Sequence, residues 1–217
     1  MGYAAVVFDN DGVLVVPTER RLLRRAAARA FAAFGVDPPP DGTAAAADGD
    51  PDRIERACDR CGIDPAAFWA ACEARAAGAQ RAALATGAKP PYGDVAALRD
   101  LDRPLGLVSN NQHATIEAIL DRFGLRGLFG AAYGREPSLR GLRRKKPATH
   151  YLDRALADLG VAPADALLVG DSNADLRAAA AAGADAAFLR RPHRADYDLA
   201  VEPTHVVDSL HDVAALA

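Results

Sequence analysis

Lysine, cysteine and long apolar runs are all scarce in this chain of 217 residues. The longest stretch without Asp, Glu, Lys or Arg runs from Pro104 to Ile116, which is too short and too polar to span a bilayer. The first residues show no basic region followed by an apolar run and a cleavage site, so we expect no secretion signal and a cytoplasmic protein. The formal net charge of -3 predicts no general affinity for nucleic acid or anionic membranes.

Three cysteines, Cys58, Cys61 and Cys72, form an odd set without a secretory context, which favours reduced thiols. Cys58 and Cys61 have the C-x-x-C spacing of some zinc and redox sites. A zinc site needs two further ligands, yet only Cys72 is nearby and no histidine occurs from residue 36 to 112. We therefore interpret the thiols as small apolar side chains on helix faces.

Short apolar runs alternate with helical segments in most of the chain. Strands are expected at 4–8, 105–108, 131–133, 166–169 and 186–189. Helices are expected at 94–101, 114–123, 148–159 and 176–182, with a last short helix after Ser209. This alternation predicts an α/β fold, a doubly wound parallel sheet of Rossmann-like type with helices on both faces.

A mostly helical block interrupts this pattern after the first strand. Its first helix is expected from a cap at Thr18 to about Phe34, and the Pro- and Gly-rich residues 36–49 are expected to form a loop. Asp50-Pro51 and Asp64-Pro65 pair a helix cap with proline at the first helical position, and their helices should end near Cys61 and about Ala79. We expect a core domain of residues 1–17 and 89–217 and a helical cap domain of residues 18–88.

Polar residues with catalytic or metal-binding potential follow the expected strands. In chain order they are Asp9, Asp11 and Gly12, then Ser109 and Asn110, then Lys146, then Asp171 and Asp175. Ligands of such sheets bind beyond the carboxyl ends of the strands, so these residues should meet at one rim. Clustered carboxylates repel one another and oxygen ligands favour Mg²⁺, so the sequence predicts a magnesium site there.

These residues match the four motifs of the haloacid dehalogenase-like (HAD) hydrolase superfamily, which the sequence resembles over roughly 1–17 and 89–190. The resemblance is to its phosphatase branch with a helical cap after the first strand, similar to phosphoglycolate phosphatase and beta-phosphoglucomutase. One departure lies at Val16–Glu19, where the family often has Asp-Ser leading into the cap.

The resemblance implies a role for each motif residue, and the chemistry of the side chains agrees with it. Asp9 is expected to attack phosphorus and form an aspartyl-phosphate, with Asp11 as general acid and base. Gly12 is expected to let the backbone turn close to the phosphate. The metal is expected on the carboxylates of Asp9 and Asp171 and the backbone carbonyl of Asp11, with Asp175 supporting it from further out or through water.

Three residues are expected to hold the transferred phosphoryl group. Ser109 and the backbone N–H of Asn110 should bind its oxygens, and Lys146 should neutralise charge on the nucleophile and the phosphate. We prefer Lys146 over Lys145 because the family's lysine is usually followed by proline. Only three lysines occur among the 26 Lys and Arg residues, which makes a lysine at a motif position more informative.

Structural interpretations of the same residues stay open at this point. The sequence Asp-Asn-Asp-Gly after the first strand is also typical of a turn, and Ser109 and Asp171 are also suitable helix caps. Lys146 also lies at the end of a basic segment, Gly134–Lys146, which we expect to be a solvated loop. An alternative interpretation is that the arginines of this loop, from Arg135 onward, bind an anionic substrate.

The predicted function is a Mg²⁺-dependent phosphomonoesterase of a small phosphorylated metabolite, such as phosphoglycolate or a sugar phosphate, acting as a monomer or homodimer. A phosphomutase is an alternative with the same core. A haloacid dehalogenase is disfavoured because those relatives lack the second Asp, here Asp11. A non-enzymatic phospho-receiver module is a further alternative, although its acceptor Asp follows the third strand and it has no such insert.

Overall fold

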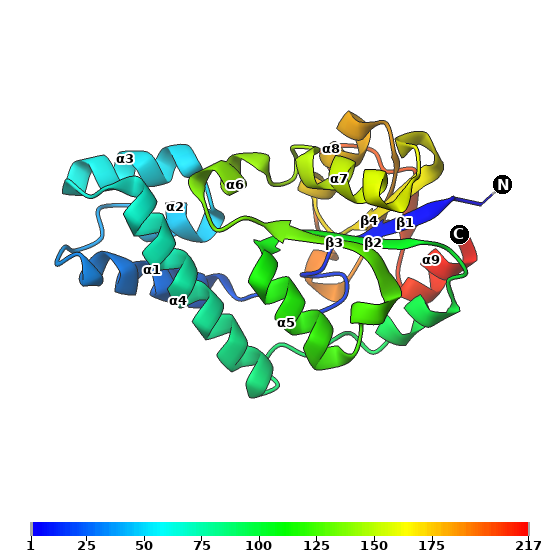
Figure 1. Cartoon of the computed structure of the whole chain (residues 1–217), viewed down its shortest axis with the longest axis horizontal. Coiled ribbons are helices and arrows are strands. Elements are labelled where there is room, and N and C mark those ends of the chain that lie inside the picture. The colour runs from blue at the N-terminus through cyan, green and yellow to red at the C-terminus, as the bar shows by residue number, and fades with distance from the viewer. Residues whose placement is uncertain (1, 217) are drawn as a thin grey trace. The chain divides into compact units, whose positions relative to one another are not determined.

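The computed structural model describes residues 2–216, which divide into two compact units (Figure 1). The α/β unit contains the chain up to Val16, Pro90–Gly134 and the chain from Arg144 onward. The helical unit contains Pro17–Lys89 and Arg135–Arg143. Residues 135–143 were expected in the α/β domain, so the structure differs from the predicted division in this segment.

The α/β unit is built on a six-stranded sheet, which confirms the predicted fold class. Its strands are β1 (Ala5–Phe8), β2 (Leu105–Gln112), β3 (Phe129–Arg135), β4 (Ala166–Gly170), β5 (Asp185–Leu189) and β6 (His205–Val207). Their spatial order is β3-β2-β1-β4-β5-β6, and β1 pairs in parallel with both β2 and β4. The edge strand β6, which also pairs in parallel, was not predicted, because three residues beginning with His205 give no apolar run.

Helices cover both faces of this sheet. They are α5 (His113–Phe123), α7 (His150–Leu159), α8 (Asn173–Ala182) and α9 (Leu210–Leu216), with short 3-10 helices at Val95–Asp100, Arg126–Leu128, Pro163–Asp165 and Pro192–Arg194. Leu152 of α7 and Leu176 of α8 share one buried cluster with Val7 and Leu168 of the sheet. Helices α5 and α9 lie on the opposite face (Figure 1).

The helical unit contains four helices from the first insert, α1 (Arg20–Ala33), α2 (Gly42–Asp48), α3 (Pro51–Cys61) and α4 (Pro65–Ala85). The predicted caps of α3 and α4 are confirmed, since Asp50 and Asp64 accept hydrogen bonds from the backbone N–H groups of Arg53 and Ala67. Thr18 does not cap α1, and its hydroxyl donates to Gln80 Oε1 at 2.7 Å instead. Within residues 2–216, no helix combines the length and apolar character needed to cross a membrane.

The loop prediction for 36–49 was wrong in its second half, where α2 forms. Gly42–Asp48 is rich in alanine, and the preceding Asp41 takes a left-handed conformation (φ 61°) that turns the chain into the helix. Ala45 and Ala46 of α2 are buried in the core of the helical unit. Tertiary packing thus supports a helix that the flanking prolines and glycines concealed.

The basic segment 134–146 is not the solvated loop that the sequence predicted. Strand β3 extends to Arg135, and α6 (Leu139–Arg144) follows and places Leu142 in the core of the helical unit. Arg135 forms a buried bidentate ion pair with Glu73 of α4, with both N–O distances at 2.7 Å. Arg143 pairs with carboxylates of α3, so these two arginines are already neutralised within the helical unit.

Two of the cysteines lie in the core of the helical unit. Cys58 of α3 and Cys72 of α4 are buried and free of disulfide bonds. Burial raises the pKa of the Cys58 thiol to about 11 and that of the Cys72 thiol to about 12, so both stay protonated at neutral pH.

Candidate active site

The residue that follows β1, Asp9, begins a tight turn at the carboxyl edge of the sheet. The backbone N–H of Asp9 donates to Val169 O of the neighbouring strand β4, which fixes its position. The carbonyl of Asn10 then accepts hydrogen bonds from the N–H groups of Leu14 and Val15. Because apolar β1 is buried between two strands, the Asp9 carboxylate is held at the rim and is itself largely buried.

The carboxylate of Asp11 is positioned by two amide side chains. Asn10 Nδ2 and Asn111 Nδ2 donate to Asp11 Oδ2 at 3.0 Å and 2.8 Å. Asn111 comes from β2, so the turn after β1 and the end of β2 meet at Asp11. The following residue, Gly12, has φ 89°, a conformation that favours glycine.

The residues predicted to bind the phosphoryl group lie at the end of β2. Ser109 is buried, and its Oγ accepts a hydrogen bond from the backbone N–H of Asn111 at 3.1 Å. It does not cap the next helix, because the N-cap of α5 is Gln112. The Asn110 side chain forms two hydrogen bonds with the backbone of Lys146, at 2.8 Å and 2.9 Å, and so ties β2 to the lysine segment.

Lys146 is the central cation of the site. Its Nζ lies 2.9 Å from Asp9 Oδ1 and 2.6 Å from Asp175 Oδ1, and it donates to Val108 O at 2.6 Å. Burial by itself lowers the pKa of Lys146, but the carboxylates of Asp175 and Asp9 outweigh it and raise the pKa above its ordinary value. The lysine therefore stays charged although it is 2 % exposed, and it is not a residue of a solvated loop.

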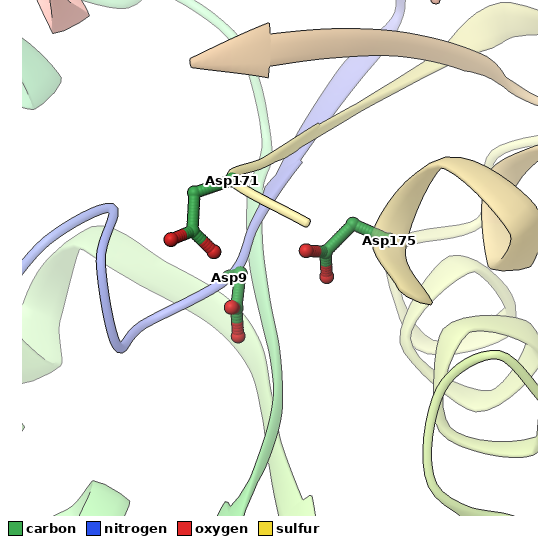
Figure 2. A group of neighbouring side chains, drawn as sticks. All are labelled: Asp9, Asp171 and Asp175. Atoms are coloured by element: carbon green, nitrogen blue, oxygen red, sulfur yellow. The ribbon is translucent and has the colours of Figure 1, made fainter. Parts of the chain in front are cut away.

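The acidic residues that follow β4 complete a cluster of three carboxylates. Oxygens of Asp9, Asp171 and Asp175 lie within 4.8 Å of one another, and all three residues are buried (Figure 2). Asp171 is not a helix cap, because the N-cap of α8 is Ser172. Asp175 Oδ2 instead accepts hydrogen bonds from the N–H and the hydroxyl of Ser172, while Oδ1 faces Lys146.

The electrostatics of this cluster fit a bound divalent cation. Burial raises the pKa of Asp9 to about 7, Lys146 opposes this rise, and the neighbouring Asp175 and Asp171 carboxylates add to it. Lys146 and Arg194, the latter beside Asp171, thus face three buried carboxylates, which still leaves an excess of negative charge among hard oxygen ligands. Such a donor set suits Mg²⁺.

Two further residues at this rim were missed by the sequence analysis. His193 Nε2 and Arg194 Nε lie 2.7 Å and 2.9 Å from Asp171 Oδ2. Both belong to the 3-10 helix that follows β5. The rule that ligands meet beyond the carboxyl ends of strands also applies to β5, so it identifies the segment past Leu189 as a candidate, but it does not predict the contacts of His193 and Arg194 with Asp171.

Comparisons with known proteins identify the family of the chain. The family described as haloacid dehalogenase-like hydrolase matches residues 3–183. Phosphoglycolate phosphatase 1 of Pseudomonas aeruginosa is 32% identical over 114 residues, which cover 52% of this chain and 40% of that protein. The matched part of the chain thus spans less than half of this relative.

Solved structures share the whole fold at low sequence identity. A CbbY mutant from Rhodobacter sphaeroides in complex with xylulose-(1,5)-bisphosphate has a TM-score of 0.72 and 22% identity, with 99% of each chain covered. A putative phosphoglycolate phosphatase from Lactobacillus plantarum has a TM-score of 0.69 and 21% identity, with 100% of each chain covered. The family match covers residues 3–183, which are most of this chain, so the chain belongs to the haloacid dehalogenase-like hydrolase family.

Proposed function

We propose that the protein is a Mg²⁺-dependent phosphomonoesterase that acts on a small phosphorylated metabolite through an aspartyl-phosphate on Asp9. The observation that carries this proposal is the position of Lys146 Nζ between Asp9 and Asp175, two of the three clustered carboxylates. A buried nucleophile, a buried cation and an acidic metal site are the parts that phosphoryl transfer needs. The family assignment and the name of the Pseudomonas aeruginosa relative support the same activity.

In the first step a carboxylate oxygen of Asp9 attacks phosphorus, and the bond from phosphorus to the ester oxygen breaks. The leaving alkoxide needs a proton, which Asp11 donates. In the second step Asp11 takes a proton from water, and that water attacks the phosphorus of the aspartyl-phosphate. Phosphate leaves and the carboxylate of Asp9 is restored. The hydrogen bonds from Asn10 and Asn111 hold the Asp11 carboxyl group in one orientation for both transfers.

Three groups at the end of β2 and beyond it would bind the phosphoryl oxygens. Ser109 Oγ and the backbone N–H of Asn110 would donate to them, and Lys146 would offset their charge. The two hydrogen bonds between the Asn110 side chain and the Lys146 backbone keep these groups together. Because residue 12 is glycine, the turn after β1 can lie close to Asp171.

The carboxylates of Asp9 and Asp171 and the backbone carbonyl of Asp11 would hold Mg²⁺, with Asp175 acting from outside the direct ligands or through water. When bound, Mg²⁺ would neutralise charge on the phosphoryl group and orient it toward the nucleophile. Among the solved relatives, CbbY from Rhodobacter sphaeroides holds phosphate in one structure and a bisphosphate in another. These ligands support a small phosphorylated metabolite as the substrate class.

A phosphate-release screen over phosphorylated metabolites with Mg²⁺ tests the proposal, with the Asp9→Asn variant as the blank. We expect release from at least one metabolite, loss of release after exhaustive chelation and recovery on adding Mg²⁺. A phosphomutase with the same core would instead convert one sugar phosphate isomer into another with little free phosphate. Release that persists in fully chelated protein would contradict the metal requirement.

A further inference from the structure

A second group of charged residues lies in the helical unit and includes no residue assigned to the candidate active site. Helix α1 packs along α4, and a groove of about 350 Å³ forms on these two helices. Four arginines line it, three from α1 and one from α4, namely Arg21, Arg25, Arg29 and Arg75. A groove of this volume lies at the lower end of the range for sites that hold small molecules.

The arginines of α1 share one side of the helix because they are spaced four residues apart. Arg21, Arg25 and Arg29 are therefore stacked one turn from each other, about 6 Å per step. Like charges at this spacing repel, and the one carboxylate in the lining, Glu19, is already bound to Arg21. The excess positive charge of the groove is therefore not balanced by its own lining residues.

Two guanidinium groups in the groove are available to a ligand. Within residues 2–216, neither the Arg25 nor the Arg29 side chain forms a hydrogen bond or an ion pair, and both residues are exposed. Arg75 donates through Nη1 to Ala71 O of its own helix at 2.9 Å, which fixes the direction of its remaining donors. Leu22 lines the groove between the charged groups and gives it an apolar wall.

We propose that this groove binds a small molecule that carries two anionic groups, either two phosphoryl groups or a phosphoryl and a carboxylate group. A guanidinium group binds such anions through two parallel hydrogen bonds, so Arg25 and Arg29 give two anchoring points one helical turn apart. The small volume of the groove favours a metabolite over an acidic protein segment. The proposal concerns the helical unit alone and does not depend on the proposed phosphatase activity.

Calorimetric titration of the full chain with inorganic pyrophosphate, in chelator and at fixed ionic strength, tests the groove directly. We expect saturable binding that is tighter than for inorganic phosphate. The double variant Arg25→Gln/Arg29→Gln should raise the Kd for pyrophosphate by about ten-fold or more. The control is Arg24→Gln, which changes an exposed arginine of the same helix outside the groove. Circular dichroism of each variant establishes that it is folded.

An unchanged Kd in the double variant, or an equal loss in Arg24→Gln, would overturn the proposal, because binding would then depend only on net charge. Wild-type protein that binds pyrophosphate no more tightly than inorganic phosphate would equally contradict a site for two anionic groups.

Discussion

Gly12 and Asp171 approach so closely that residue 12 has no room for a side chain. A Cβ atom on residue 12 would lie 2.2 Å from Asp171 Oδ2 and 3.1 Å from His193 Nε2. The two residues are far apart in the sequence, yet the turn after β1 and the end of β4 are neighbours in the sheet. Glycine at position 12 is therefore required by the proposed metal site as well as by the turn.

Replacing Gly12 by alanine should displace Asp171 and weaken Mg²⁺ binding. Gly160→Ala is a matched control, because Gly160 also has positive φ (68°) but a Cβ atom on residue 160 would meet no other atom within 4 Å. Both variants should lose about 1–2 kcal/mol of stability from backbone strain. Only Gly12→Ala should lose Mg²⁺ affinity in calorimetric titration, and unchanged affinity in that variant would contradict the assigned role of Asp171.

Asp9→Asn should leave a folded protein whose turnover is lower by about 10³-fold or more, because an amide is a poor nucleophile. Acid-quenched wild-type protein should carry a phosphoryl group on the peptide that contains Asp9, and mass spectrometry detects it. Asp102→Asn, at an exposed site, is the control and should keep full turnover. A phosphorylated peptide elsewhere in the chain would remove Asp9 from the role.

The metal-free protein should lose stability as the pH rises from about 4 to about 7. Burial is the main cause that raises the pKa of Asp9 to about 7 from an ordinary 3.8, so in this window the folded state holds a proton that the unfolded state has released. Asp9→Asn removes this contribution. Urea denaturation in chelator should show the wild type losing stability relative to the variant up to about pH 7, and parallel pH curves would argue against the raised pKa.

Asp11→Asn should lower the rate of phospho-enzyme formation, the first chemical step, far more with alkyl phosphates than with aryl phosphates. General acid catalysis raises the rate by about 10²–10⁴-fold, and a good leaving group departs without being protonated. Rapid-quench measurement of phospho-enzyme formation separates this step from hydrolysis. If the loss is the same for every leaving group, Asp11 is not the proton donor.

Glu73→Gln should destabilise the helical unit strongly, because it leaves the buried Arg135 guanidinium without its counter-charge. Removing one partner of a buried pair costs about 3–5 kcal/mol, whereas an exposed pair is worth less than about 1 kcal/mol. Asp208→Asn, which breaks the exposed pair with Arg190, is the control. The single tryptophan, Trp69, lies beside Arg135 (5.3 Å from the guanidinium carbon to the ring centroid), so its fluorescence reports unfolding of this region.

The sequence predicted the sheet core well, because its strands are apolar runs followed by polar turns. Asp9, Asp171 and Asp175 follow from that pattern, whereas Lys146 was chosen from the family resemblance. The structure brings all four together. Features that depend on tertiary contacts could not be predicted in the same way. The helical state of residues 42–48 depends on burial of their alanines, which the neighbouring prolines and glycines concealed.

The same limit applies to residues 135–143 and to the rim after β5. A run of arginines has the composition of a solvated loop, and only the structure shows that Arg135 meets Glu73, 62 residues away in sequence. Likewise, nothing local in Pro192–Arg194 indicates that His193 and Arg194 reach Asp171. Long-range charge pairing leaves no periodic signal in a single sequence.

The pairing of Arg135 with Glu73 also bears on the order in which the chain can fold during synthesis. Residues 17–89 leave the ribosome well before residues 135–143, yet Leu142 fills part of the core that α1 to α4 enclose. The core of the helical unit therefore cannot be completed until β3 and α6 have been translated, and until then Glu73 lacks its arginine partner. It follows that a fragment ending before residue 135 contains every long helix of this unit and still cannot complete its core.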